Sequence, residues 1–425
     1  MTRLRIATGE TFRSLRTRNF RLFFVGQLVS QAGTWMQSVA IIFVVLRLSD
    51  DGVALGVATA AQFLPVLVLG AWAGVVADRV DCHRFLLVTQ SAFAVVAVAF
   101  TVLTFADAET LPLIYLLSGL FGMVTALDNP SRRALVVELV AETDVPNAVG
   151  LNSALMTGSR VIGPAAAGLL ITTAGPEWCF LVNAVTYAAV LIALARIDRS
   201  ELRSPPRVAR EKGQLRDGFR YVWATPELRL PLVLLAVIGT LSFEFQVTLP
   251  LLAERSFGGD AGTFSMLYSA MSVGAVIGAL TVARRTDVGT RFLAVSAMWM
   301  AGAMGMLAIA PNEWFALAAI VPVGLTSIFL ISGSNTVIQL RADPSMRGRA
   351  LALTAVVFLG STPIGGPIAG AVSEYLGPRA GIAMGAAASA LAALWTISSL
   401  RRLEAGEPDP APRIAPLRAP AIVRS

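Results

Sequence analysis

The stretch Gly74-Val-Val-Ala-Asp78-Arg79-Val-Asp81-Cys-His-Arg84 decides the fold, because it gathers charges between two long apolar runs. A short charged segment between two stretches of membrane length predicts a tight turn at a membrane surface. Charges at such a turn can bridge neighbouring helix ends in a contact that forms and breaks. We therefore expect a membrane protein that changes conformation rather than a passive anchor.

The composition of the whole chain agrees with this interpretation. Of the 425 residues, 55% are hydrophobic and 14% are charged, whereas an average soluble domain has about 25% charged residues. Apolar runs long enough to cross a bilayer recur along the chain. We predict an all-α integral membrane protein with twelve transmembrane helices. The expected spans are 20–46, 53–76, 85–106, 112–131, 147–173, 177–196, 230–252, 263–283, 292–310, 314–338, 350–375 and 380–400.

Basic residues collect on one side of the predicted membrane. If both termini and the even-numbered connections share a side, that side carries every Lys and Arg except Arg47, Arg160, Arg255 and Arg379. Cytoplasmic loops of membrane proteins are enriched in Lys and Arg. Both termini are therefore expected in the cytoplasm. The net charge of +7 reflects this topology and does not indicate nucleic-acid binding.

The two halves of the chain repeat each other. Gly163-Pro164 in the fifth predicted span matches Gly366-Pro367 in the eleventh, and Arg284 to Asp287 is a degraded counterpart of Asp78-Arg79. Internal repeats of this kind are typical of secondary transporters. We predict two pseudo-symmetric six-helix bundles. The expected parts are a bundle at 1–196, a cytoplasmic linker at 197–229, a second bundle at 230–400 and a disordered cytoplasmic tail at 401–425.

With these motifs, the chain resembles the major facilitator superfamily. Gly74-x-x-x-Asp78-Arg79-x-x-x-x-Arg84 is similar to the superfamily signature between spans 2 and 3. Other stretches resemble the exporter branch that includes the enterobactin exporter and macrolide-efflux proteins. These stretches are Arg18–Phe23, Gly33–Gln37, Leu127–Ala134 and Asn147–Gly168.

The resemblance implies the major facilitator fold and a conformational latch made of Gly74, Asp78, Arg79 and Arg84. The latch would hold spans 2 and 11 together while the substrate site faces outward. The alternative is a charge cluster that only sets topology. Many relatives have an Asp where this chain has Thr34, so the position of any proton carrier has to be argued separately.

The fifth span contains small residues and a proline at Gly158, Gly163, Pro164 and Gly168. Small residues let transmembrane helices approach closely, and Pro bends them. The antiporter branch of the superfamily has a similar motif, which favours export. Ordinary helix packing is the alternative explanation.

Three ionisable residues lie in or beside predicted spans, where charges are rare and usually functional. Glu244 in the seventh span is the first candidate for the coupling proton, and Asp128 is the second. Arg160 in the fifth span either binds an anionic group of the substrate, forms a structural ion pair with Asp128 or Glu244, or marks a wrong span boundary. Asp128, Arg132 and Arg133 lie near the cytoplasmic end of the fourth span, where a gate or interface ion pair is the favoured interpretation. For Glu244 the alternative is an acid that only stabilises the bundle.

Polar residues at helical spacing follow one face of the first span. They predict a wet substrate path lined by that face, or else hydrogen bonds between helices. The residues of the stripe are Gln27, Ser30, Gln31, Thr34 and Gln37, with Trp35 beside them and Asn335 as a weaker case in the tenth span.

No catalytic residues, metal ligands or phosphate-binding loop are found, so neither an enzyme nor a cofactor is expected. The leading interpretation is a secondary active exporter of small amphipathic molecules, such as a drug, a siderophore or a lipid-like metabolite, in a bacterial inner membrane. Proton antiport with alternating access would drive it. The expected partners are a small-molecule substrate, protons and the lipid bilayer, with the chain a monomer. The alternatives are a facilitator or importer on the same fold, or a membrane sensor or scaffold that does not transport.

Overall fold

The computed structural model describes residues 11–77, 79–203, 214–285, 287–344 and 346–405. Twelve helices in this part of the chain are long and apolar enough to cross a membrane, as predicted. The first six make one bundle. They are α2 (Arg18–Ser49), α3 (Gly52–Ala77), α4 (Cys82–Phe105), α5 (Leu111–Glu138), α6 (Val145–Thr173) and α7 (Pro176–Ala195).

The second bundle has the same plan, except that its first span is made of several pieces. Those pieces are α9 (Pro226–Leu241), α10 (Phe245–Leu251) and η4 (Leu252–Ser256). The remaining spans are α11 (Ala261–Ala283), α12 (Thr290–Ala308), α13 (Glu313–Arg341), α14 (Arg347–Leu376) and α15 (Pro378–Glu404). The short helices η1 (Arg13–Arg16), η2 (Glu142–Asp144) and η3 (Arg199–Glu201) lie beside the first bundle, and α8 (Gln214–Ala224) precedes the second.

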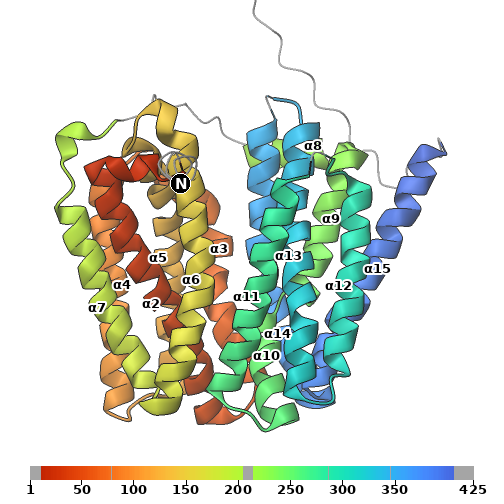
Figure 1. Ribbon diagram of the computed structural model, residues 1–425, viewed down its shortest axis with the longest axis horizontal. Helices are drawn as coiled ribbons and strands as arrows, with labels where there is room; N and C mark the ends of the chain where they lie inside the picture. The colour runs from red at the N-terminus through yellow and green to blue at the C-terminus, as the bar shows by residue number, and fades with distance from the viewer. Residues whose placement is uncertain (1–10, 78, 204–213, 286, 345, 406–425) are drawn as a thin grey trace, which may run out of the picture.

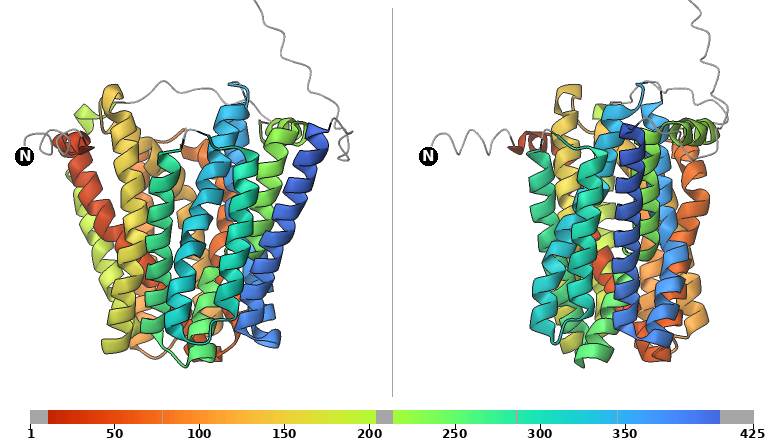
Figure 2. Two further views of the ribbon diagram at one scale, coloured as in Figure 1. Left: turned by 45° about the vertical axis from the view of Figure 1, so that its right-hand side comes forward. Right: turned by 90° about the vertical axis from the view of Figure 1, so that its right-hand side faces the viewer.

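The two bundles stand side by side with their helices upright, while α8 lies across one end of the second bundle (Figure 1, Figure 2). We call the end that carries α8 and η3 the linker face, and the opposite end the far face. Across the boundary, α3 packs on α14 and α6 packs on α11. These pairs occupy equivalent places in the two halves, as the repeat in the sequence predicted.

Within each bundle, glycines allow close helix contacts. A Cβ at Gly324 of α13 would lie 1.8 Å from the carbonyl oxygen of Met271 in α11, and one at Gly274 would lie 1.9 Å from that of Val321. Only glycine fits such backbone contacts, which replace the hydrophobic driving force that is missing between helices in lipid.

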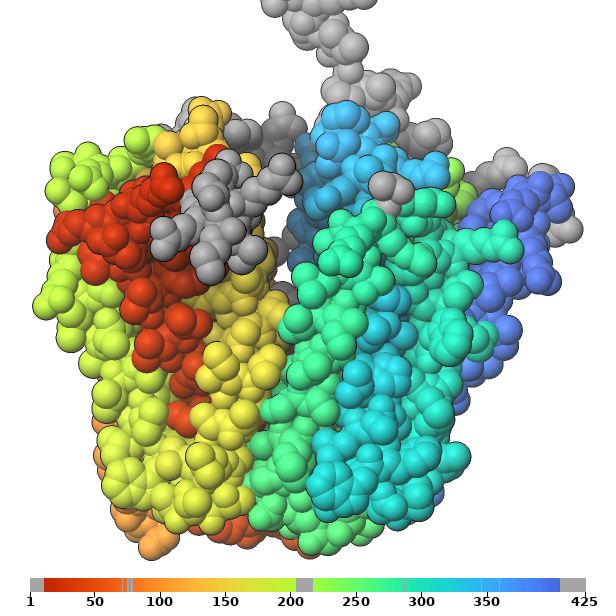
Figure 3. Space-filling model, viewed as in Figure 1, coloured from red at the N-terminus to blue at the C-terminus, as the bar shows by residue number. Residues whose placement is uncertain are grey.

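The boundary between the bundles is tight toward the far face and open toward the linker face. A Cβ at Gly56 of α3 would lie 2.5 Å from the carbonyl oxygen of Gly366 in α14, and one at Gly370 would lie 2.2 Å from that of Gly52. Toward the linker face a hollow separates the bundles (Figure 3). The structure therefore has one end closed and the other open.

Several predicted boundaries need correction. The seventh span is not one helix, because the α-helix stops at Leu241 and resumes at Phe245. The fourth span continues to Glu138 instead of ending at residue 131. The predicted linker contains the helix α8, and the tail predicted from residue 401 begins inside α15. The remainder of the predicted disordered tail, residues 406–425, lies outside the described residues.

Candidate functional site

A cationic side chain lies where the two bundles meet. The guanidinium carbon of Arg160 on α6 is 5.1 Å from the centre of the Trp35 ring on α2. The Trp35 ring centre is 6.3 Å from that of Tyr268 on α11. The hydroxyl of Ser272, also on α11, donates a hydrogen bond of 3.3 Å to the Arg160 carbonyl oxygen. Residues of both bundles therefore surround Arg160.

Two small residues of the motif in the fifth span bring these helices together. A Cβ at Gly163 would lie 2.5 Å from the Trp35 Cβ, and one at Gly168 would lie 2.5 Å from the Ser265 side chain of α11. Gly163 thus sets the α2–α6 contact and Gly168 the α6–α11 contact. Pro164 is buried inside α6, whereas a Cβ at Gly158 would meet nothing within 4 Å.

Glu244 lies at the break in the seventh span, at the residue before α10 begins. Its side chain is 3% exposed, and Oε1 has no hydrogen-bond partner among the described residues. A Cβ at Gly365 of α14 would lie 2.7 Å from that oxygen, and Thr362 of α14 is within hydrogen-bonding reach of the carboxyl. A buried carboxylate is costly unless it is protonated or paired, so Glu244 is a candidate for a proton-binding group.

Asp128 is also buried, but unlike Glu244 it has a basic partner among the described residues, together with hydrogen-bond donors at its carboxylate. Its Oδ1 accepts hydrogen bonds from the Thr89 hydroxyl at 2.7 Å and the Gln90 amide at 2.8 Å. Its Oδ2 lies 3.5 Å from Nε of Arg132, one turn further along α5. The predicted fourth span ended at residue 131, but α5 continues to Glu138, so Arg132 lies within the helix and not after it. The structure pairs Asp128 with Arg132 and not with Arg160.

The polar stripe on α2 divides into two groups. Gln27, Ser30 and Gln37 are each 1% exposed. Gln37 accepts a 2.7 Å hydrogen bond from the Asn183 amide of α7. The Thr34 hydroxyl is 2.9 Å from that of Tyr187, also on α7.

Hydrogen bonding between helices therefore suits Gln37 and Thr34 better than lining a cavity does. Gln31 and Trp35 are half-buried and remain candidates for a substrate path, as does the half-buried Asn335 on α13.

The predicted latch is only partly within the structure, because Asp78 lies outside the described residues. Arg79 and Arg84 are exposed, and Gly74 is half-buried near the end of α3. Asp81 caps α4 through a 3.0 Å hydrogen bond from the Arg84 backbone. It also forms ion pairs with Arg84, at 3.7 Å, and with Arg199 of the linker. The latch function stays a prediction.

Sequence reasoning missed a charged contact that joins the bundles at the far face. Arg255 of η4 and Glu374 of α14 form a 2.9 Å ion pair within the second bundle. Arg255 also donates to the carbonyl oxygen of Asp50 at 2.5 Å, and the Gly52 amide donates to Glu374 at 2.8 Å. Asp50 and Gly52 belong to the turn between α2 and α3. We call these four residues the far-face clamp. The only signal in the sequence was that Arg255 is one of the few basic residues on that side.

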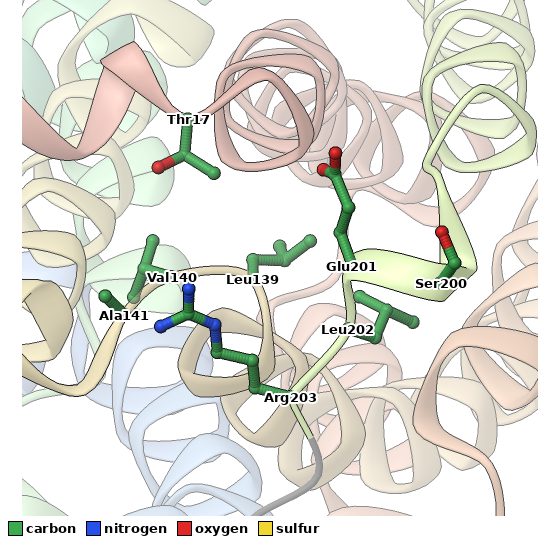
Figure 4. A pocket seen from close by; sticks show the side chains of 8 residues that line it. All are labelled: Thr17, Leu139, Val140, Ala141, Ser200, Glu201, Leu202 and Arg203. Atoms are coloured by element: carbon green, nitrogen blue, oxygen red, sulfur yellow. The ribbon is translucent and has the colours of Figure 1, made fainter.

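A cavity of about 470 Å³ lies on the linker face of the first bundle, between the end of α5 and η3 (Figure 4). Its lining comes from the first bundle and the start of the linker, and includes Thr17, Leu139, Glu201 and Arg203. Among the described residues, its lining includes none from the second bundle, so this cavity is separate from the boundary where Arg160 lies.

Comparisons with known proteins agree with the fold and with the features of the sequence. The staphyloferrin A transporter of Staphylococcus aureus is 26% identical over 264 residues, which are 62% of this chain and 66% of that protein, just under two thirds of its length. The multidrug efflux pump Tap of Mycolicibacterium fortuitum is 24% identical over 84% of this chain and 90% of that protein.

A solved structure shows the same fold. A bacterial homologue of the human lysosomal transporter Spinster, in an inward-facing conformation, superposes with a TM-score of 0.74 at 14% identity, over 93% of this chain and 99% of that one. The family model for the transmembrane secretion effector matches residues 9–422. With twelve membrane-length helices in two bundles and a match along nearly its whole length, the chain belongs to the transmembrane secretion effector family of major facilitator transporters.

Proposed function

We propose that the protein is a secondary active exporter of small amphipathic molecules, driven by proton antiport through alternating access. The carboxyl of Glu244 is buried and has no cationic partner among the described residues, and this is the observation that carries the proposal of proton coupling. The similarity to the multidrug efflux pump Tap supports export over import.

The closed and open ends of the boundary between the bundles support alternating access. Opening the far face would require the far-face clamp to break and the α3–α14 and α6–α11 contacts to separate. Closing the linker face would bring the ends of α3 and α14 together, where the Asp78-Arg79 latch is proposed to act. If the linker face is cytoplasmic, as the basic loops predict, the present state is open to the cytoplasm.

Glu244 is placed to couple a proton to this movement. Its carboxyl lies against Gly365 of α14, and α14 packs on α3 across the boundary. In the present state burial favours the protonated carboxyl. Loss of the proton would therefore favour a conformation in which Glu244 is hydrated or paired. A proton that enters from the far face would favour the closed far face, and its later loss to the linker face would favour reopening of the far face, so a proton gradient would drive the cycle in one direction.

A measurement without substrate tests this coupling. We expect higher pH to reduce the population with a closed far face, because the ionised carboxyl of Glu244 is unfavourable there. Glu244→Gln should keep the far face closed at every pH. Distances between spin labels across the far face, recorded on protein in nanodiscs from acidic to alkaline pH, report the population. Glu313→Gln, at the far-face end of α13, is the control and should behave as wild type.

An unchanged pH response in Glu244→Gln would remove Glu244 as the coupling residue. A wild-type equilibrium that does not respond to pH would instead favour the facilitator or importer. Export itself is tested in cells that lack the protein, by profiling secreted metabolites and retained compounds with and without a protonophore.

A further inference from the structure

We propose that Arg160, with Trp35 and Tyr268, forms a binding subsite for the carboxylate of an amphipathic, anionic substrate. This inference rests on the proposed transport function and names the class of molecule that the site would carry. It starts from a charge that no acidic group among the described residues neutralises.

Arg160 has no acidic partner among the described residues. The sequence suggested two buried acids, Asp128 and Glu244, as ion-pair partners of Arg160. Asp128 instead pairs with Arg132, and Glu244 lies against Gly365 of α14. Arg160 is nevertheless near the middle of α6, a helix of 29 residues. An arginine at that depth is costly unless it faces a cavity or binds a partner. Its side chain is exposed, so the guanidinium remains available to a ligand.

The position of Arg160 along the boundary is that of a substrate site. On α6, the contacts with α11 run from Thr172 and Gly168 near the far face up to Arg160, whose carbonyl accepts from Ser272. Toward the linker face the bundles diverge around a hollow (Figure 3). On the linker side of Arg160, a Cβ at Gly158 or Gly150 would meet nothing within 4 Å, so the close contacts of α6 end near Arg160. A molecule that entered from the linker face would meet Arg160 at the bottom of its path.

The neighbouring groups suit an amphipathic anion. A guanidinium offers two parallel N–H donors to a carboxylate, and stacking on Trp35 holds it in place. The Trp35 and Tyr268 rings supply an apolar surface for the rest of the molecule. Gln246 is within hydrogen-bonding reach of the Tyr268 hydroxyl. It follows Glu244 by two residues, so α10 connects the proposed subsite with the coupling acid.

The test measures binding and does not depend on transport. The full chain in phosphatidylcholine nanodiscs is titrated at neutral pH with 2-naphthoate and with its neutral counterpart 2-naphthamide, by isothermal titration calorimetry. We expect wild type to bind naphthoate roughly tenfold more tightly than naphthamide, as a charge-assisted hydrogen bond would provide. Arg160→Gln should lose that preference, and Arg160→Lys should keep part of it.

Arg285→Gln is the matched control, because Arg285 also stacks on an aromatic ring, at 4.5 Å from the Phe292 centre. It should keep the full preference for naphthoate. Equal affinities in wild type, a preference that survives in Arg160→Gln, or no naphthoate binding at millimolar concentration would each overturn the proposal. If added phosphatidylglycerol displaces both ligands and wild type binds naphthoate and naphthamide equally, Arg160 binds a lipid headgroup. That result would also overturn the proposal.

The outcomes separate this inference from the proposed function. If naphthoate binding depends on Arg160 while the conformational equilibrium ignores pH, proton antiport fails and the anion subsite stands. If the pH response depends on Glu244 but Arg160→Gln binds as wild type, the subsite fails and antiport stands. Arg160→Lys and the elution profile of each variant show whether a loss of binding comes from misfolding.

Discussion

Replacing Gly56 by alanine should open the far face. The Cβ added at Gly56 would lie 2.5 Å from the Gly366 carbonyl oxygen and 2.9 Å from both the Gly366 carbonyl carbon and the Pro367 Cα. All three are backbone atoms, so no side chain can rotate away. The shortest contact falls about 0.9 Å short of the 3.4 Å at which ordinary contact begins. The helices α3 and α14 must therefore separate at this point.

The size of the effect follows from the cost of overpacking. Forcing an extra carbon into a packed contact costs about 1–3 kcal/mol. Alanine also favours the helix over glycine by about 1 kcal/mol. This gain does not change the ratio of the two conformations, because α3 is helical in both. The ratio of the closed to the open far face should therefore fall by about 5-fold to 150-fold.

Electron–electron distances between two nitroxides measure that ratio. Labels at Ala108 in the first bundle and Pro311 in the second occupy exposed far-face turns. Cys82 and Cys179, both buried, are first replaced by alanine. Gly305→Ala on α12 is the matched control, because a Cβ there would meet nothing within 4 Å. A distance distribution for Gly56→Ala that matches wild type and Gly305→Ala would refute the reasoning that Gly56 holds the far face closed.

Two further predictions concern the charged groups. Glu374→Gln should weaken the far-face clamp by about 0.5–1 kcal/mol, since its ion pair with Arg255 is partly exposed. Glu374→Gln should shift the distance distribution between the far-face labels toward the open form, and the shift should be smaller in high salt. An equal shift in Glu313→Gln would contradict the role of the clamp. Asp128→Asn should destabilise the fold by about 3 kcal/mol, because it leaves Arg132 buried without its counter-charge. Thermal unfolding measures this loss of stability, and the double variant Asp128→Asn/Arg132→Gln should regain part of the lost stability. An unfolding midpoint of Asp128→Asn equal to that of wild type would disprove the prediction.

The spans and their repeat could be predicted from the sequence because the bilayer imposes local rules. Each crossing needs a continuous apolar run that satisfies its own backbone hydrogen bonds, and basic residues collect on one side. These constraints act within some twenty neighbouring residues, so they can be read in order along the chain. The matched Gly-Pro motifs of the fifth and eleventh spans then indicated two bundles. The family match supports the same organisation.

The tertiary structure alone decided which polar groups meet. Gln37 accepts a hydrogen bond from Asn183, and Arg255 donates one to Asp50, which is 205 residues away in the sequence. The break before Glu244 was equally hidden, since Leu241 to Phe245 contains no proline or glycine that would force a helix to stop. Composition can place a charge in a span, but its partner depends on how distant helices pack. That packing separates the paired Asp128 from Arg160, for which the described residues contain no counter-charge, and so distinguishes a structural charge from a candidate binding group.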